Sequence, residues 1–416
     1  MNAASDYSSE ALNEVSAPGA TPDGVLDRGV ICFAGEDWWY HNRGHFDMQV
    51  MRRLARCVPV LFVNSIVMQR PRWSEGKKLF RKIARKLQSI RRGLQHVENR
   101  FYAFSPISVP LHHREFGRVA NCLGVLAQVR WAAWRLKMTS PLVWVECPAA
   151  CDIALRLSRS ALVYQRTDRH EEFRSEEGGY IDVQISQYDD RLRRESDLVV
   201  YASGALFEDE KQSVRRAFLS DHGVDFARFA KAARDRVVPE DIKHVREPMV
   251  GFFGAIDDHT FDVPFATRVV QLLPQLSFVF VGHASTDVSS LARQPNVTLV
   301  GQRPYELIPS YGAAFRVAIM TWRRNRWIHY CNPVKLKEYL ALGLPVVSTP
   351  FHHLGRYDEC VAVAETPEAF AKAISESLEH DGAGAIAKRQ DRVRGCTWES
   401  VTARLVEEIR SIPGRR

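Results

Sequence analysis

The sequence predicts an α/β protein built from two successive parallel sheets, each flanked by helices. From residue 29 onward, short apolar runs alternate with segments of helical periodicity, the pattern of strand–helix–strand units. The alternation stops in a polar stretch at 231–248 and then begins again. A chain of 416 residues is also too long to fold around a single hydrophobic core, so two domains are expected.

The first unit is expected at 29–230, with a strand at each of its apolar runs and a helix after each strand. The polar N-terminus, 1–28, has neither a basic start nor an apolar run, so we expect a disordered leader rather than a signal peptide. The runs are GVICFAG (29–35), VPVLFVN (58–64), RFYAFSPI (100–107), PLVWVE (141–146), ALVYQRT (161–167) and DLVVYAS (197–203).

A second unit is expected at 249–396, after a linker at 231–248. A last helix within 397–416 is indicated by the spacing of Val401, Leu405 and Ile409. Two such units imply a cleft between them, with ligands beyond the carboxyl ends of the strands. The apolar runs are MVGFFGAI (249–256), LSFVFVG (276–282), VTLVG (297–301), FRVAIMT (315–321) and PVVST (345–349).

Composition narrows the class of protein. Hydrophobic residues make up 45% and charged residues 25%, which is ordinary for a globular enzyme, and the net charge is +8. The eight cysteines show no C-x-x-C spacing, which predicts a reducing cytoplasm and argues against zinc. No stretch approaches 18 continuous apolar residues, so we expect no membrane-spanning segment.

The stretch HYCNPVKLKEYLALGLPVVST (329–349) predicts a helix from about Pro333 to Leu342, with Asn332 as its cap and Gly343 at its end. Lys335 then lies in the first turn, where free N–H groups and an ammonium can bind a phosphate. Lys337 shares that turn. The alternative is that both lysines are solvated.

Four segments of the sequence together resemble GT-B glycosyltransferases in their order and spacing. The resemblance covers about 29–412. It implies a nucleotide-sugar in the second domain, the acceptor in the first, and a C-terminal helix that crosses back to the first domain. The segments are SDLVVYASGALFEDEKQSVRRAFLSDHGVDFARF, VGFFGAI, NVTLVGQRPYELIPSYGAAFRVAIM and NPVKLKEYLALGLPVVST.

The candidate donor-binding residues are the cap Asn332 and four residues to which the resemblance assigns roles. It places Lys335 on the diphosphate and Glu338 on the ribose, although Glu338 could instead form a surface ion pair with Lys335. It makes Gly254 the glycine at which backbone approaches the donor, and a plain turn glycine is the alternative. It places Tyr305 beside the base of the nucleotide, and packing of Tyr305 in the core is the alternative.

Retaining members of the family carry a glutamate eight positions before the second one, where this sequence has Tyr330. The sequence is therefore more similar to inverting relatives such as the bacterial exopolysaccharide glucuronosyltransferases. These need a general base, and Asp168, directly after a strand, resembles their strand-end aspartate. A helix-capping role for Asp168 is the alternative, and His170 is a weaker candidate base.

The loop GEDWWYHNRGHF (35–46) follows the first strand, and Asp37, Trp38 and His41 are its candidate acceptor contacts. The same aromatic residues could instead form a lid packed on the sheet. Asp37 is the second candidate for the base.

Residues 76–94 predict an amphipathic helix with eight basic residues. Such a helix can bind an anionic membrane surface, which suits a polyprenyl-diphosphate-linked acceptor. Alternatively, its apolar stripe meets the sheet and its basic face is solvated. We therefore expect a cytoplasmic protein, peripheral on the inner face of the membrane.

The leading hypothesis is an inverting sugar transferase for a bacterial surface glycan, with a UDP-sugar donor and with no cofactor or metal, since no D-x-D lies in a suitable loop. A nucleotide-sugar epimerase of the same architecture is one alternative. A nucleic-acid-binding protein is another, which the lack of a recognisable binding module opposes.

Overall fold

The computed structural model describes residues 24–40, 43–66, 77–108, 115–167, 169 and 180–413. The chain divides into two compact units. Unit 1 comprises the residues up to Asp221 together with those from Glu399 onward, and unit 2 runs from His222 to Trp398. Both are α/β units, as the sequence predicts.

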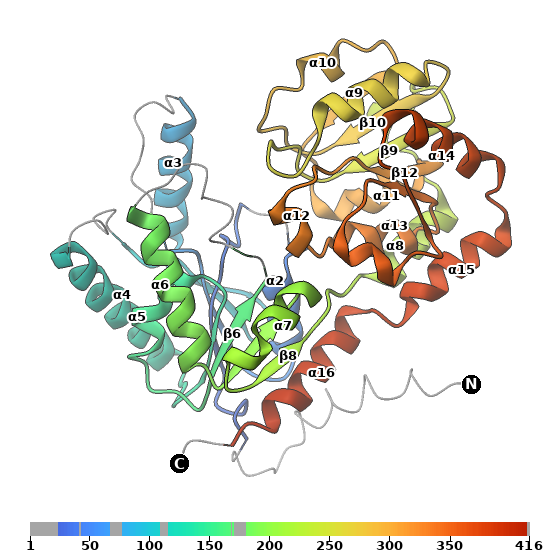
Figure 1. Cartoon of the computed structure of the whole chain (residues 1–416). Helices are drawn as coiled ribbons and strands as arrows, with labels where there is room; N and C mark the ends of the chain where they lie inside the picture. Colours follow the sequence, from blue (N-terminus) through green and yellow to red (C-terminus); the bar gives the residue numbers. More distant parts are fainter. Residues whose placement is uncertain are drawn as a thin grey trace. The chain divides into compact units, whose positions relative to one another are not determined.

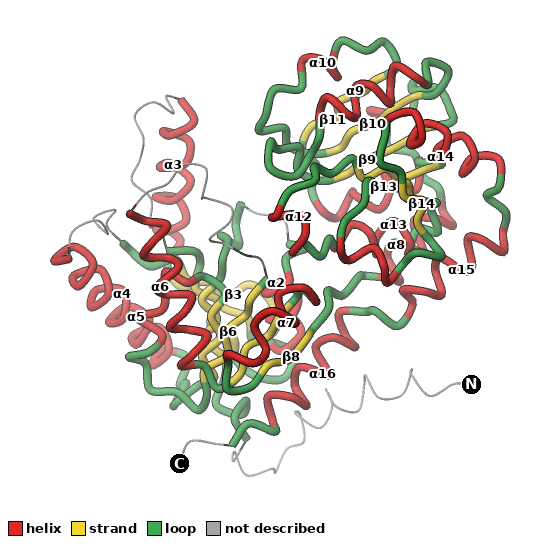
Figure 2. The backbone as a smooth tube through the Cα atoms, viewed as in Figure 1, coloured by secondary structure: helices red, strands yellow, loops and turns green. Residues whose placement is uncertain are grey.

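Unit 1 is built on a sheet whose strands are drawn in yellow in Figure 2, where β3, β6 and β8 are labelled. The sheet has eight strands in the order β3-β4-β2-β1-β5-β6-β7-β8. Neighbouring strands are parallel except β3 and β4. The strands are β1 (Val30–Phe33), β2 (Val60–Val63), β3 (Leu94–Glu98), β4 (Phe101–Phe104), β5 (Leu142–Val145), β6 (Leu162–Arg166), β7 (Leu198–Tyr201) and β8 (Ala217–Leu219).

The inner strands of unit 1 are buried on both faces, because helices cover the sheet from either side. This explains why they read as continuous apolar runs in the sequence. The helices are α2 (Phe46–Leu54), α3 (Lys77–Arg92), α4 (Glu115–Arg135), α5 (Cys151–Ala154), α6 (Tyr180–Glu195) and α7 (Gly204–Glu210), with single turns η3 (Pro148–Ala150) and η4 (Lys211–Ser213).

The C-terminal helix α16 (Trp398–Arg410) packs on unit 1. The Arg53 guanidinium on α2 pairs with Glu399 at 2.9 Å, and Arg216 beside β8 pairs with Glu408 and donates a hydrogen bond of 3.0 Å to the Ser411 carbonyl. The prediction that a disordered leader extends to residue 28 is wrong. Val25 and Leu26 are buried, and the Ser160 hydroxyl donates a 2.7 Å hydrogen bond to the Val25 carbonyl. Residues 1–23 lie outside the described residues.

Unit 2 contains a six-stranded parallel sheet in the order β11-β10-β9-β12-β13-β14. Figure 1 labels β9, β10 and β12 of this sheet. The strands are β9 (Met249–Phe253), β10 (Ser277–Val281), β11 (Val297–Gly301), β12 (Val317–Met320), β13 (Val346–Ser348) and β14 (Val361–Val363). The helices are α8 (Phe226–Asp235), α9 (Val263–Leu272), α10 (Ser289–Ala292), α11 (Ile308–Ala313), α12 (Arg326–Tyr330), α13 (Val334–Ala341), α14 (Pro367–Glu379) and α15 (Ala383–Arg394), with turns η5 (Glu240–Ile242), η6 (Tyr305–Leu307) and η7 (His352–Arg356).

The segment predicted as a linker, 231–248, belongs to unit 2. Helix α8 begins inside unit 2, capped by the Asp225 carboxylate, and continues to Asp235. Within the segment, Ile242 in η5 is fully buried in the unit 2 core, and Ala232, Ala233, Val238 and Val245 pack against that core. The polar composition of 231–248 is thus that of a surface segment held by a few apolar anchors, and the prediction of a linker is wrong.

Three short strands, β3, β8 and β14, were not among the predicted strands. Each lies at one end of its sheet. An edge strand packs less completely than a central one, so its sequence lacks a continuous apolar run. In β3, for example, Gln95 and His96 are exposed.

Candidate active site

The candidate donor site lies at the carboxyl edge of the unit 2 sheet. Strands β9, β12 and β13 are neighbours in this parallel sheet, so their carboxyl ends meet at one edge. The residue after β9 is Gly254, and Trp322 follows β12 by two residues. Helix α13 begins one residue before Lys335 and brings this lysine to the end of β9.

The Lys335 ammonium is held against two aromatic rings. Its Nζ atom lies 4.5 Å from the centre of the Phe252 ring and 5.6 Å from that of Trp322. The negative faces of these rings attract a cation. Burial nevertheless lowers the pKa of Lys335 to about 8, although the carboxylates of Asp257 and Glu338 oppose the shift. An anionic ligand beside the ammonium would raise the pKa of Lys335 again and so favour its charged form.

Two glycines make room for this lysine. Gly254 has a φ of +141°, and a Cβ atom there would lie 2.3 Å from the Lys335 Nζ. A Cβ atom on Gly282 would lie 1.8 Å from the Gly254 carbonyl oxygen. The chain therefore has no room for a side chain at Gly282, where β10 ends beside Gly254. Only glycine combines this backbone conformation with the space that Lys335 occupies.

Glu338 lies one helical turn after Lys335 and is only 5% exposed. The Tyr305 hydroxyl donates a 2.6 Å hydrogen bond to its Oε1 atom. Burial raises the pKa of Glu338 to about 7, and the hydrogen bond from Tyr305 and the charge of Lys335 limit that rise. The carboxyl group can therefore accept hydrogen bonds from a ligand's hydroxyls, which favour its ionised form.

Tyr305 is buried in η6, 6.4 Å from the ring of Phe229. This is the core-packing alternative that the sequence left open, together with a role for its hydroxyl in holding Glu338. Glu338 is likewise too buried for the surface ion pair considered as its alternative. The next residue, Tyr339, accepts a 2.9 Å hydrogen bond from the Phe253 amide and so ties α13 to β9.

The start of α13 differs by one position from the prediction. Pro333 occupies the cap position, with no side-chain cap, and Asn332 precedes it. Asn332 is buried, with 8% exposure. Lys337 is 1% exposed, so the alternative in which both lysines are solvated does not hold. Gly343 ends the helix region with a φ of +77°, as expected.

The loop that follows β9 adds a carboxylate that the motif did not include. Asp257 accepts hydrogen bonds from the amides of His259 and Thr260, at 3.1 and 2.8 Å, and from the Thr260 hydroxyl at 2.9 Å. The sequence analysis assigned no role to this aspartate. Phe252 and Trp322 were also missed, and their positions at the ends of β9 and β12 were the available signal. In the described ranges no cluster of three or more His, Cys, Asp or Glu residues could hold a metal ion.

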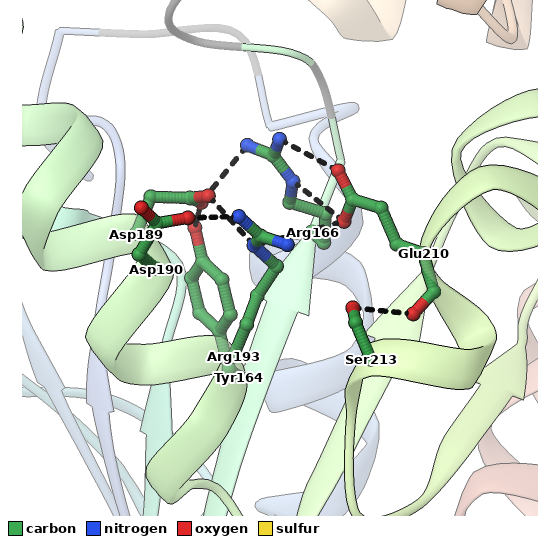
Figure 3. Close-up of polar contacts among 7 residues, drawn as sticks. All are labelled: Tyr164, Arg166, Asp189, Asp190, Arg193, Glu210 and Ser213. Atoms are coloured by element: carbon green, nitrogen blue, oxygen red, sulfur yellow. Dashed lines mark hydrogen bonds and ion pairs between the residues drawn. The ribbon is translucent and has the colours of Figure 1, made fainter.

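In unit 1, the candidate bases Asp168 and His170 and the candidate acceptor contact His41 lie outside the described residues. The strand end two residues before Asp168 is described and is held by a buried ion-pair network (Figure 3). Arg166, fully buried, pairs with Asp189 at 2.9 Å and with Glu210 at 3.1 Å. Arg193 pairs with the second oxygen of Asp189 at 3.0 Å.

Trp38 lies in the core of unit 1, with 1% exposure and its ring 4.5 Å from that of Phe101. This residue therefore packs on the sheet, as the alternative interpretation of the loop proposed, and the acceptor-contact assignment for it is wrong. Asp37 is 6% exposed and accepts a 2.7 Å hydrogen bond from the Ser89 hydroxyl. Because α3 supplies Ser89, Asp37 joins the first loop to that helix.

Helix α3 contacts unit 1 through polar groups. Ser89 is fully buried, and the Lys86 ammonium donates a 2.8 Å hydrogen bond to the Ser65 carbonyl. Burial lowers the pKa of Lys86, and the Asp37 carboxylate opposes this. The apolar residues Ile83 and Leu87 are 39% and 61% exposed. The alternative in which the apolar stripe meets the sheet therefore does not hold at Ile83 and Leu87, whereas Ile90 near the end of the helix is half-buried.

Together, two parallel α/β units and a C-terminal helix returning to the first define the GT-B fold. Residues 247–380 match the family model described as "Glycosyl transferases group 1". This range contains Gly254, Tyr305, Lys335 and Glu338. Most of unit 2 is therefore similar to a group 1 glycosyltransferase domain, and the resemblance to GT-B glycosyltransferases stated from the sequence is confirmed.

Particular relatives agree with this class. The chain is 30% identical over 135 residues to TuaH of Bacillus subtilis, a glycosyltransferase provisionally assigned to teichuronic acid biosynthesis. The match covers 31% of this chain, and the chain spans only 33% of the length of TuaH.

Solved structures extend the fold similarity to nearly the whole chain. Sucrose-phosphate synthase from Thermosynechococcus elongatus has a TM-score of 0.66 at 13% identity, covering 91% of this chain and 97% of its own. Anabaena HepE, solved with UDP and glucose, has a TM-score of 0.61 at 13% identity, covering 92% and 99%. At these identities the similarity establishes the fold.

Proposed function

We propose that the protein is a glycosyltransferase that moves a sugar from a UDP-sugar to a glycan or lipid-linked acceptor in bacterial surface polysaccharide synthesis. The observation on which the proposal depends is the group of Lys335, Gly254 and Glu338 at the carboxyl edge of unit 2. It provides one cation, one close backbone approach and one hydrogen-bond acceptor, within a region similar to a group 1 glycosyltransferase domain.

The donor would bind with its diphosphate at Lys335 and its ribose at Glu338. Lys335 and Glu338 suit this arrangement, because residues three apart lie on one face of a helix. The buried ammonium would stabilise the negative charge that develops on the diphosphate as the sugar departs. UDP is proposed because HepE was solved with UDP and glucose. A glycan acceptor is proposed because TuaH is assigned to teichuronic acid biosynthesis.

The proposed transfer is inverting and independent of metals, with Asp168 as the base that takes the proton from the acceptor hydroxyl. Two observations support this. Tyr330 replaces the carboxylate of the retaining relatives and is buried at the end of α12. Strand β6, which leads to Asp168, ends in the network around Arg166, so its last residue has a fixed position (Figure 3).

The proposed acceptor is attached to a lipid, so we also propose peripheral membrane binding through residues 76–94. The exposed Ile83 and Leu87 and the basic composition of α3 support this. None of the helices in the described ranges is long and apolar enough to cross a membrane.

Ligand-dependent thermal unfolding tests the proposed function. UDP-glucose and UDP should raise the melting temperature, because a ligand bound to the native state stabilises it. GDP and TDP provide the comparison for the base, and an oligonucleotide tests the nucleic-acid alternative. If no nucleoside diphosphate changes the melting temperature, the proposed function is rejected. Stabilisation by UDP with release of glucose from UDP-glucose would support a transferase over an epimerase.

A further inference from the structure

The outward face of helix α4 in unit 1 is an apolar stripe. Its large members are Phe116, Val119, Leu123, Trp131 and Trp134, which are 86%, 49%, 57%, 50% and 69% exposed. Their spacing of three, four, eight and three residues places them on one helical face. Ala120 and Ala127 on that face are exposed too, and so is Arg130, whose guanidinium donates a 2.9 Å hydrogen bond to the Arg156 carbonyl. From Phe116 to Trp134 the stripe is about 27 Å long, at 1.5 Å per residue.

The opposite face of α4 is also apolar and packs on unit 1. Val125, Val129 and Ala132 are fully buried there. Large apolar side chains therefore lie on two opposite faces of α4. In the described part of unit 1 one of these faces is covered, whereas the stripe is largely exposed, and its Trp131 ring centre lies 6.5 Å from that of Phe104. A large apolar face turned outward on a helix indicates a surface that a partner or lipid covers.

The exposure is concentrated rather than scattered. Of the fourteen large hydrophobic residues exposed in the described part of the chain, nine lie between residues 83 and 183, all in unit 1. One of them, Ile107, is 61% exposed and lies beside α4, because the Gln128 side chain hydrogen-bonds both its amide and its carbonyl. Single exposed apolar residues are normal, but an extended patch indicates an interaction surface.

The charge around the stripe selects the partner. Helix α4 contains Arg118, Arg130 and Arg135 against one acid, Glu115, and α3 contains eight basic residues and no acid. An anionic lipid surface complements this charge, whereas a second copy of the chain would bring the same positive charge to the contact. Tryptophan is favoured where an apolar layer meets water.

We infer that the stripe on α4, defined by Phe116, Val119, Leu123, Trp131 and Trp134, docks unit 1 on an anionic membrane surface. The helix lies along the headgroup layer, with its outward face in contact with the acyl chains. This deepens the membrane binding proposed for residues 76–94, on which it rests for its setting, by assigning the apolar contact to a different helix. The contribution of α3 is then mainly electrostatic.

Salt separates the two contributions, because ions screen the attraction of exposed charges but not the burial of apolar surface. The experiment is flotation of the full chain with phosphatidylcholine vesicles containing phosphatidylglycerol, at low salt and at about 0.5 M salt. The variant is Phe116→Ser combined with Trp134→Ser. A matched control, Leu307→Ser with Val363→Ser, removes two exposed apolar residues of unit 2, which are 47% and 49% exposed.

The partition of the wild-type chain should persist in part at high salt, and the α4 variant should reduce the high-salt partition at least tenfold. The control should match the wild type. Both variants should keep their melting temperature, since all four positions are exposed. An unchanged partition of the α4 variant overturns the inference, as does a wild-type chain that does not float with these vesicles.

A third contrary result is a wild-type dimer in analytical ultracentrifugation that the α4 variant converts to monomer, because a second copy would then cover the stripe. Donor chemistry provides an independent readout. The flotation contains no nucleotide, and hydrolysis of UDP-glucose in solution should be equal in the α4 variant and the wild type. A failed docking test therefore leaves the proposed function standing, and a failed donor test leaves the docking result interpretable.

Discussion

Lys335 is a cation that is desolvated before any ligand binds. Its pKa is lowered to about 8, and its partners are two aromatic rings together with the charges of Asp257 and Glu338. Burial therefore destabilises the charged form of Lys335 in the free protein, and a bound diphosphate would stabilise that form. This arrangement provides charge stabilisation without rearrangement at the moment of reaction.

Lys335→Ala should weaken binding of UDP-glucose and slow transfer, while the melting temperature stays near that of the wild type. A positioned charge of this kind contributes roughly 2–4 kcal/mol to a transition state. Calorimetric titration and steady-state kinetics measure the two effects. Lys372→Ala removes an exposed lysine of unit 2 and should change neither. Unchanged kinetics in folded Lys335→Ala protein would exclude Lys335 from the diphosphate site.

The affinity for UDP-glucose should be highest between about pH 7 and 8. Below about pH 7, Glu338 binds a proton and must lose it before it accepts hydrogen bonds from the ribose as a carboxylate. Above about pH 8, Lys335 loses its proton and must regain it to pair with phosphate. Titrations across pH 6–9 measure both limbs.

Variants assign the two limbs to residues. Glu338→Gln should remove the acid limb. Tyr305→Phe should move that limb to higher pH, because the lost hydrogen bond lowers the pKa of Glu338 in the wild type. Lys335→Arg should remove the alkaline limb, since a guanidinium stays charged. An acid limb that survives in Glu338→Gln would show that another group produces it.

At the scale of elements, the network around Arg166 joins β6, α6 and α7 (Figure 3). Arg166→Met should destabilise unit 1 by about 3–5 kcal/mol, because Asp189 and Glu210 would remain buried with less compensating charge. The urea midpoint measures this loss. Arg191→Met, on α6, is the control. Its pairs with Asp152 and Glu195 are partly exposed, and their loss should cost less than about 1 kcal/mol. Equal losses would argue against a structural role for the buried network.

Helix α3 allows a separate test of electrostatic membrane binding. Changing Lys77, Lys78, Arg81 and Lys82 to glutamine should weaken binding of the protein to anionic vesicles at low salt, because each basic residue near the surface contributes about 1 kcal/mol. Lys86 is left unchanged, since its ammonium binds the Ser65 carbonyl. Hydrolysis of UDP-glucose should be unaffected. Undiminished vesicle binding at low salt would exclude α3 as a contributor.

For the whole molecule, Asp168→Asn tests whether unit 1 supplies the base. Asparagine retains the size and the capping oxygen, so stability should hold. If Asp168 is the base, transfer should fall by about 10²–10⁴-fold, whereas UDP-glucose binding in unit 2 should survive. The transferred sugar should have the opposite anomeric configuration to the donor. A retained configuration, or normal transfer by Asp168→Asn, would remove Asp168 from the mechanism and make Asp37 the next candidate.

The sequence by itself determined the fold class, because a strand buried on both faces leaves an unbroken apolar run that needs no tertiary information. It also located Lys335 and Glu338, since the signals that start and end α13 are local. The edge strands β3, β8 and β14 were not predicted, because a partly buried strand has no unbroken apolar run.

Only the tertiary structure decided what each side chain contacts. It placed Trp38 in the core, brought Tyr305 to Glu338 across 33 residues, and set Phe252 and Trp322 around Lys335. It also joined 231–248 to unit 2 and left one apolar face of α4 exposed. These outcomes depend on contacts between residues distant in sequence, and the periodicity of a single helix or strand contains no information about its partner.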